Sequence, residues 1–141
     1  MLIEGHHIES SLDRARLWAE LVALENISEW SALDECVSAD SPNFEMASSY
    51  VCKHHAGLHG VDATVEVEEL KEAERLVLRT ETMVAELLET LELTDHLEGS
   101  LLTYSVDATS GSFGPSATLW LRHHVQFVCE RLEEFANRPV R

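Results

Sequence analysis

The sequence is poor in basic residues, and lysine is especially scarce. Only 10 of its 141 residues are Lys or Arg, against 26 that are Asp or Glu, so the formal net charge is -16. A field of that sign repels DNA, RNA and anionic membrane surfaces, and we therefore expect no nucleic-acid partner. The same charge can instead serve solubility alone, and it then carries no information about a ligand.

Long apolar runs and a targeting segment are also missing. No stretch approaches the ~20 consecutive apolar residues of a membrane-spanning helix. The opening MLIEGHHIES lacks the basic start and apolar middle of a signal peptide. These two absences predict a cytoplasmic protein without integral membrane association.

Cysteine is sparse and follows no motif. Cys36, Cys52 and Cys129 are an odd number, lie far apart and include no CxxC pair. In a reducing compartment such residues are most simply buried thiols, so the sequence predicts no redox activity.

The histidines are numerous but do not follow the spacing of a metal site. They cluster in CKHHAGLH and HHVQFVC, whereas zinc ligands come in recognisable pairs that converge on one point. His54 and His55 would face opposite sides of a strand, and His123 and His124 are about 100° apart on a helix. We predict solvated histidines, no metal and no cofactor. The absence of a P-loop or GxGxxG motif also argues against nucleotide chemistry.

The clearest element that is present is a long amphipathic helix over residues 116–137. Pro115 and Pro139 bracket it, and at 1.5 Å per residue it spans roughly 33 Å, enough to cross a small domain. Apolar residues recur on one face at helical spacing: Ala117, Leu121, Val125, Val128, Leu132 and Phe135.

Most of the preceding sequence alternates with the period of a strand. Residues 61–68 are the clearest case, with valine or alanine at every odd position and a polar residue at every even one. This alternation leaves one face of the sheet exposed to water, which is typical of antiparallel pairing. The expected strands are 2–10, 35–40, 44–54, 61–70, 75–82, 86–94 and 100–108, with turns at 41–43, 55–60, 71–74 and 95–99, a connection at 83–84 and a loop at 108–116.

Two short helices interrupt this pattern after the first strand. Ser11 is expected to cap the first, and Asn26 with Glu29 has the spacing of a capping box for the second. The whole order predicts a single α+β domain over residues 1–141. It consists of a seven-stranded curved antiparallel sheet, two short helices after strand 1, and the long C-terminal helix across the concave face. A single helix does not fill such a sheet, so we expect a cavity beneath it.

The stretch IESSLDRARLWAELVALENISEW resembles the START-related helix-grip superfamily (SRPBCC), within it the polyketide cyclase/dehydrase and lipid-transport group. Ile8, Leu17, Trp18, Leu21 and Trp30 stand at the positions of its opening motif, and GSLLTYSVDA is similar to its last strand. The resemblance implies a cavity for hydrophobic molecules such as lipids, quinones, sterols or polyketides. In some members it also implies cyclisation or dehydration. The motifs are structural and transfer no catalytic set.

Inward polar and aromatic residues are the candidates for contact with a ligand. The strand register points Tyr50 and Tyr104 toward the helix, where each can bond a ligand or simply pack its ring. Trp120, His123 and Phe127 are expected at the cavity mouth, while Trp18 and Trp30 are expected as core anchors. The predicted ligand-binding set is Met46, Tyr50, Leu78, Glu89, Tyr104, Trp120, His123 and Phe127.

Glu89 is the most informative of these residues because its own strand face is otherwise leucine. A carboxyl among leucines could have a raised pKa and act as a general acid or base. The alternatives are that a bulge near Leu88 turns it outward, or that an arginine pairs with it.

Three functions remain open at this point. The first is binding of a hydrophobic small molecule under the terminal helix. The second is a cyclase or dehydratase that uses Glu89 or a cavity tyrosine as acid or base. The third is a protein-interaction module of the co-chaperone type, which an exposed apolar patch would favour. A homodimer is left open.

Overall fold

The computed structural model describes residues 2–3, 7–37, 41–54, 61–83, 85–111 and 117–138. The predicted turn at 55–60, the connection at Val84, and both Pro115 and Pro139 lie outside this part. The elements in chain order are β1 Leu2–Ile3, β2 His7–Ser10, α1 Arg14–Val22, the 3-10 turn η1 Leu24–Asn26, α2 Ile27–Trp30, β3 Leu33–Val37, β4 Ser49–His54, β5 Val61–Lys71, β6 Arg75–Thr82, β7 Ala85–His96, β8 Gly99–Gly111 and α3 Ala117–Ala136.

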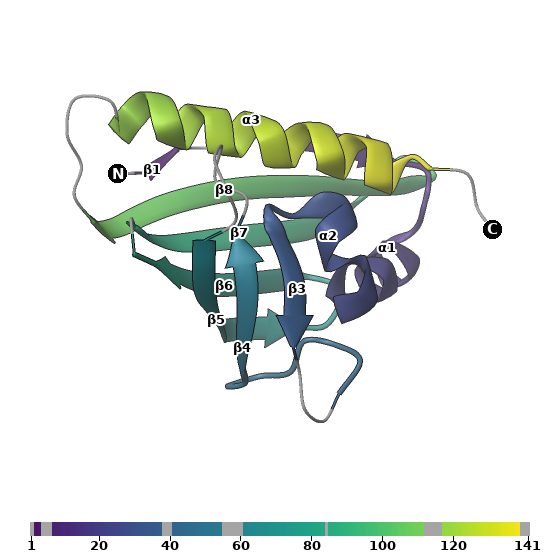
Figure 1. Ribbon diagram of the computed structural model, residues 1–141. Coiled ribbons are helices and arrows are strands. Elements are labelled where there is room, and N and C mark those ends of the chain that lie inside the picture. The colour runs from purple at the N-terminus through teal and green to yellow at the C-terminus, as the bar shows by residue number, and fades with distance from the viewer. Residues whose placement is uncertain are drawn as a thin grey trace.

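The strands form one antiparallel sheet in the order β1-β8-β7-β6-β5-β4-β3. β2 also pairs with β8, further along the same edge as β1, so the sheet is seven strands wide. In Figure 1, α3 lies across one side of this twisted sheet, with α1 and α2 beside its C-terminal end. The predicted α+β architecture is therefore confirmed.

The terminal helix buries the face that its apolar spacing predicts. It packs on β1, β2, β8 and α2. Leu121, Val125, Val128, Leu132 and Phe135 are all buried, as the stripe requires. The strand faces also follow the prediction along β5 and β6, where Ala63, Val65, Val67, Leu78 and Thr80 are buried. The sheet and α3 thus enclose one hydrophobic core.

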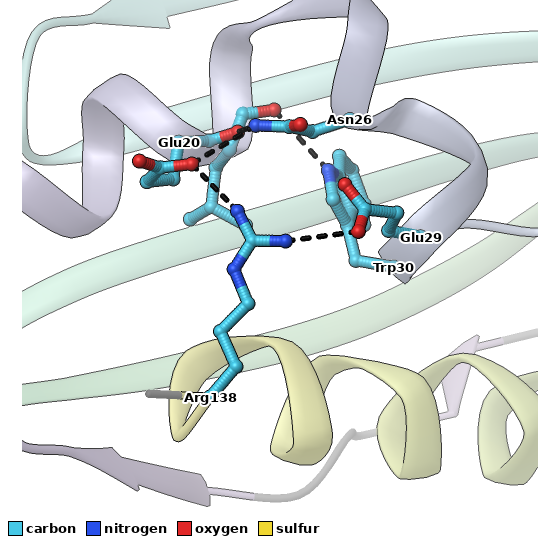
Figure 2. A network of polar contacts seen from close by, with 6 residues as sticks. Glu20, Asn26, Glu29, Trp30 and Arg138 are labelled. Atoms are coloured by element: carbon cyan, nitrogen blue, oxygen red, sulfur yellow. Dashed lines mark hydrogen bonds and ion pairs between the residues drawn. The ribbon is translucent and has the colours of Figure 1, made fainter. Parts of the chain in front are cut away.

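The N-terminal motif residues lie in this core. Trp18 and Trp30 are both buried, as expected of core anchors, and Nε1 of Trp30 donates to the carbonyl of Leu21 at 3.2 Å. Figure 2 shows the polar contacts beside Trp30, where Arg138 follows α3 and reaches Glu20 of α1 at 2.7 Å and Glu29 of α2 at 2.9 Å. These ion pairs fix the helix end beside the two short helices.

Both helix caps differ from the prediction. Asp13, not Ser11, caps α1, because its carboxylate accepts the N–H of Arg16 at 2.8 Å. Asn26 makes no capping bond to α2; its amide instead donates to the carbonyl and carboxylate of Glu20, both at 3.0 Å. A 3-10 turn precedes α2 and leaves Asn26 helical, so it cannot adopt the extended cap conformation.

The strand predicted at 44–54 begins only at Ser49. Ala47 has φ of 61°, a left-handed conformation that breaks the alternation before Tyr50. Met46 consequently sits in a turn with 56% of its surface exposed. Residues 49–54 then alternate as predicted.

The cysteine prediction is wrong for two of the three residues. Cys36 of β3 and Cys52 of β4 form a disulfide, with their Cα atoms 4.1 Å apart, and only Cys129 is a buried free thiol. The spacing of the cysteines along the chain did not indicate this pair. The two residues come together only because β3 and β4 pair in the sheet.

Candidate functional site

Glu89 lies on the inner face of β7, as its alternation with Leu87 and Leu91 predicts. The residue is only 2% exposed. The ladder to β8 does shift, but between Glu86 and Leu87, and this irregularity does not turn Glu89 outward. The outward alternative is therefore wrong, and the partner of the carboxylate is a histidine rather than an arginine.

The carboxylate of Glu89 is surrounded by polar groups from three other elements. The hydroxyl of Tyr104 on β8 donates to Oε2 at 2.5 Å, and that of Thr80 on β6 donates to Oε1 at 3.3 Å. Nε2 of His124 on α3 lies 3.6 Å from Oε2 and 3.2 Å from the Tyr104 oxygen. We call Glu89, Tyr104, Thr80 and His124 the buried polar cluster.

His124 is held by stacking as well as by these polar contacts. Its ring lies nearly parallel to Trp120, one turn earlier on α3, at 5.7 Å between centroids. It also stacks on His54 at the end of β4, at 5.3 Å. Both histidines are buried, so the prediction of solvated histidines is wrong for these two. His124 could have been found from the sequence, because it lies three residues after Leu121 and four before Val128 on the apolar stripe.

Hydrogen-bond counting fixes which nitrogen of His124 carries a proton. A tyrosine hydroxyl has one proton, and Tyr104 gives its proton to Glu89. The Tyr104 oxygen must then accept from Nε2–H of His124. Nδ1 of the same ring is buried and has no hydrogen-bond partner within the described part of the chain.

The cluster sets the charge of its members. Burial by itself would raise the pKa of Glu89, but the hydrogen bond and charge of His124, with smaller effects of Tyr104 and His54, lower it below the usual range. Burial, together with the charge and hydrogen bond of Glu89, raises the pKa of Tyr104 well above its ordinary value. The carboxylate is thus ionised and the phenol keeps its proton, with Nε2 of His124 placed 3.6 Å from the buried charge.

Two of the remaining predicted ligand contacts adjoin this cluster, since Leu78 pairs with Glu89 and Trp120 stacks on His124. Tyr50 is buried, but its hydroxyl accepts the backbone N–H of Glu45 at 2.9 Å. Leu78 is buried and pairs with Glu89 across β6 and β7. Trp120 is half-buried, whereas Met46, His123 and Phe127 are exposed. The sequence predicted His123 at the cavity mouth, but the histidine that faces the interior is His124.

Outside this cluster, the described part of the chain has open grooves but no group of metal ligands. Over the described residues, no group of three or more His, Cys, Asp or Glu side chains is placed to hold a metal ion. Two open grooves lie elsewhere on the surface, one around the β7–β8 turn and the end of α3, the other around Arg14 and Arg75. No helix in the described part is long and apolar enough to cross a membrane.

Solved structures share this fold, in which a long helix crosses an antiparallel sheet. A START superfamily protein from Mycobacterium smegmatis superposes with a TM-score of 0.74 at 10% identity, and the match covers 96% of each chain. Protein CV1439 from Chromobacterium violaceum superposes with a TM-score of 0.71 at 14% identity over 99% of each chain.

A third similar structure is DynU16, a protein of the dynemicin biosynthetic locus. Its TM-score is 0.71 at 15% identity, and the match covers 95% of this chain but 46% of DynU16. No family model matches the sequence, and no curated protein matches it either. The resemblance in sequence to the helix-grip superfamily is thus confirmed in its fold.

Proposed function

We propose that the protein binds a hydrophobic small molecule between the sheet and α3. The buried polar cluster is the observation that carries this proposal. A charged carboxylate and a histidine nitrogen without a partner are costly in an apolar interior unless they are used. START-type folds commonly bind hydrophobic ligands at this position, which supports the same function.

Extraction of the purified protein tests the proposal directly. We expect mass spectrometry of the organic phase to identify a co-purified apolar molecule. We also expect N-phenyl-1-naphthylamine, a neutral dye that fluoresces in apolar sites, to bind the emptied protein. An empty extract together with no dye signal would contradict the proposal.

Two matched variants test whether the dye binds beneath α3. Val106 pairs with Glu89 and is fully buried on the inner face, whereas Val51 is 63% exposed on the outer face. Val106→Phe fills space beneath α3 and should weaken dye binding, at a stability cost of about 1–3 kcal/mol. Val51→Phe adds the same ring outside and should leave the affinity unchanged. Circular dichroism confirms that both variants fold.

The second candidate function is proton transfer on a bound substrate, as in a cyclase or dehydratase. Burial of Glu89 favours it, since a solvent-facing carboxylate would have removed the best residue. The lowered pKa of Glu89 leaves the carboxylate ionised and the raised pKa of Tyr104 leaves the phenol protonated, so Glu89 is restricted to the role of base and Tyr104 to that of proton donor.

The proton-transfer candidate is tested with 2-acetylnaphthalene, whose methyl protons are weakly acidic. In D2O, NMR should show protein-dependent deuterium exchange at that methyl group, and Glu89→Gln should abolish it. Exchange at the same rate in the variant would reject Glu89 as the base.

A further inference from the structure

The disulfide between Cys36 and Cys52 lies at an irregular edge of the sheet. β3 is an edge strand, and of the described strands it pairs only with β4. Its register with β4 shifts between Asp34 and Val37, and beyond the shift it continues at a single pair, Val37 with Val51. An edge strand has ladder hydrogen bonds on one side only, and a register shift interrupts them further. The covalent bond therefore holds a part of β3 that the ladder holds weakly.

Glu35, inside this irregular stretch, favours opening. Its φ is 51°, a left-handed conformation that is unfavourable for a residue with a Cβ atom. A residue keeps such a conformation only while its surroundings impose it. The side chain is exposed, and the backbone N–H donates to the carboxylate of Asp34 at 2.9 Å, a local bond that does not reach β4. Release from the adjacent Cys36 would let this backbone relax.

The start of β3 is held by contacts that do not involve the disulfide. Leu33 is completely buried, and its N–H donates to the hydroxyl of Ser31 at 3.1 Å. Arg131 of α3 donates to the carbonyl of Ser31 at 3.3 Å and to that of Ser28. These contacts join the end of α2 and the start of β3 to the core, so loss of the disulfide leaves them in place.

The chain after β3 is also anchored independently, from residue 42 onward. The carbonyl of Pro42 accepts the N–H of Leu24 at 2.8 Å, and the N–H of Phe44 donates to the carbonyl of Val22 at 2.9 Å. Phe44 is buried in the core as well. Among the described residues, the effect of the disulfide is thus confined to positions 35–37, between two fixed regions.

The two sulfur atoms differ in access. Cys36 is half-buried and Cys52 is 2% exposed, so a reductant reaches Cys36 first. A thiolate of a dithiol attacks Sγ of Cys36, the S–S bond breaks, and Sγ of Cys52 leaves as a thiolate that takes up a proton. The second thiol of the reductant then displaces Cys36 and closes a cyclic disulfide. The reductant thus loses two electrons and two protons, which appear in two cysteine thiols.

We propose that the disulfide between Cys36 and Cys52 is a redox-sensitive switch at the sheet edge. Reduction by a dithiol releases residues 35–37 from β4, while the start of β3 and the rest of the sheet keep their structure. A small-molecule disulfide reverses the exchange and restores the edge. This inference needs no ligand, so it stands or fails separately from the proposed function.

Backbone NMR relaxation measures the release directly. In the oxidised protein the amide order parameters of residues 35–37 should be about 0.85, and dithiothreitol should lower them below about 0.6. Those of Leu33 and Phe44 should not change. The double variant Cys36→Ser with Cys52→Ser should be mobile at 35–37 with or without dithiothreitol. Cys129→Ala keeps the disulfide and should respond as the wild type does.

Two variants of Glu35 test the contribution of its backbone. Glu35→Gly and Glu35→Ala both remove the carboxylate, but only glycine adopts a left-handed φ without a steric penalty. In buffers of reduced and oxidised dithiothreitol, the equilibrium constant for disulfide formation should be about threefold or more higher in the glycine variant than in the alanine variant. Equal constants would overturn the role assigned to Glu35.

The reactivity of the reduced thiols separates local release from general unfolding. Iodoacetamide should label Cys36 at least about tenfold faster than the buried Cys129. Equal rates, or loss of the circular dichroism signal on reduction, would mean that the disulfide holds the whole domain, and the switch would be overturned. Order parameters at 35–37 that stay high in the reduced protein would overturn it as well.

Discussion

Glu89 shows how strongly a single position depends on the side chains that surround it. In isolation a leucine-lined carboxyl would hold its proton, yet His124 and Tyr104 keep it ionised. A buried ion pair of this kind is weak evidence for added stability, because desolvation of both charges offsets their attraction. Its effect should instead be visible in how stability depends on pH.

The pH dependence follows from the direction of the shift. The pKa of folded Glu89 lies below its unfolded value of about 4.5. The stability that Glu89 contributes is therefore complete above that pH and is lost as the pH falls through the folded pKa. Urea unfolding between roughly pH 6 and pH 3 should show a shallower loss of stability in Glu89→Gln than in the wild type.

Glu66 provides the matched control for this measurement. It lies on the exposed face of β5, away from the buried polar cluster. Glu66→Gln should give a curve parallel to the wild type. The assignment of an ionised Glu89 would be rejected if the Glu89→Gln curve were parallel as well.

At the scale of elements, the end of β2 and the start of β8 approach very closely. A Cβ atom built at Gly99 would lie 1.9 Å from the carbonyl oxygen of Ser10, and the backbone would have to shift to make room for it. Hydrogen bonds hold the same junction, from Ser10 to the carbonyl of Ala136 at 2.6 Å and from Ser100 to that of Leu12 at 2.8 Å.

Gly99→Ala should therefore destabilise the protein by about 3 kcal/mol, the upper part of the range for overpacking. Glu98→Ala changes the exposed neighbouring residue and should alter stability by less than about 0.5 kcal/mol. Urea denaturation of the two variants provides the comparison. Equal unfolding free energies for the two variants would mean that Gly99 and Ser10 are further apart than described.

The disulfide links β3 to β4 at the other edge of the sheet. Cys36 and Cys52 are 16 residues apart, and closing a loop of that size stabilises a fold by about 3 kcal/mol in the chain-entropy account. Replacing both by serine should lower the unfolding free energy by about that amount. Dithiothreitol should destabilise the wild type and leave the double variant unchanged.

Thiol titration checks that the bond is present in the isolated protein. Denatured protein should show one reactive thiol, Cys129, and reduction should raise this number to three. Three thiols before reduction would contradict the bond. A persistent disulfide would favour an oxidising location over the cytoplasm predicted from the sequence.

For the whole molecule, net charge is the dominant electrostatic feature. The chain carries a formal charge of -16, and self-repulsion of that size destabilises the compact state. Exposed ion pairs such as Arg14 with Asp95 contribute little against it. Screening should therefore stabilise the protein.

We expect the midpoint of thermal unfolding to rise as NaCl increases from about 0.05 M to 0.5 M, as the Debye length shortens. Replacing the exposed Glu133 and Glu134 near the end of α3 by glutamine should raise the midpoint at low salt and reduce its further rise. A midpoint that falls with salt would mean that surface ion pairs outweigh the repulsion.

The sequence by itself determined the elements and the faces they bury. Helical spacing placed Leu121 and Val125 inward on α3, and alternation placed Glu89, Tyr104 and Thr80 on the inner face of the sheet. The helical face follows from a repeat of 3.6 residues and the strand face from a repeat of 2, and each repeat is a local property of the chain. Turn chemistry was less certain, because Ala47 adopts a left-handed conformation that no pattern around it indicates.

Only the tertiary structure decided which side chains meet. Glu89 with His124, His54 with His124, and Cys36 with Cys52 come from elements far apart in the chain. Their contacts depend on strand order, on register and on the rotation of α3 about its axis. A local pattern does not encode these quantities, because they are set by packing the whole core at once.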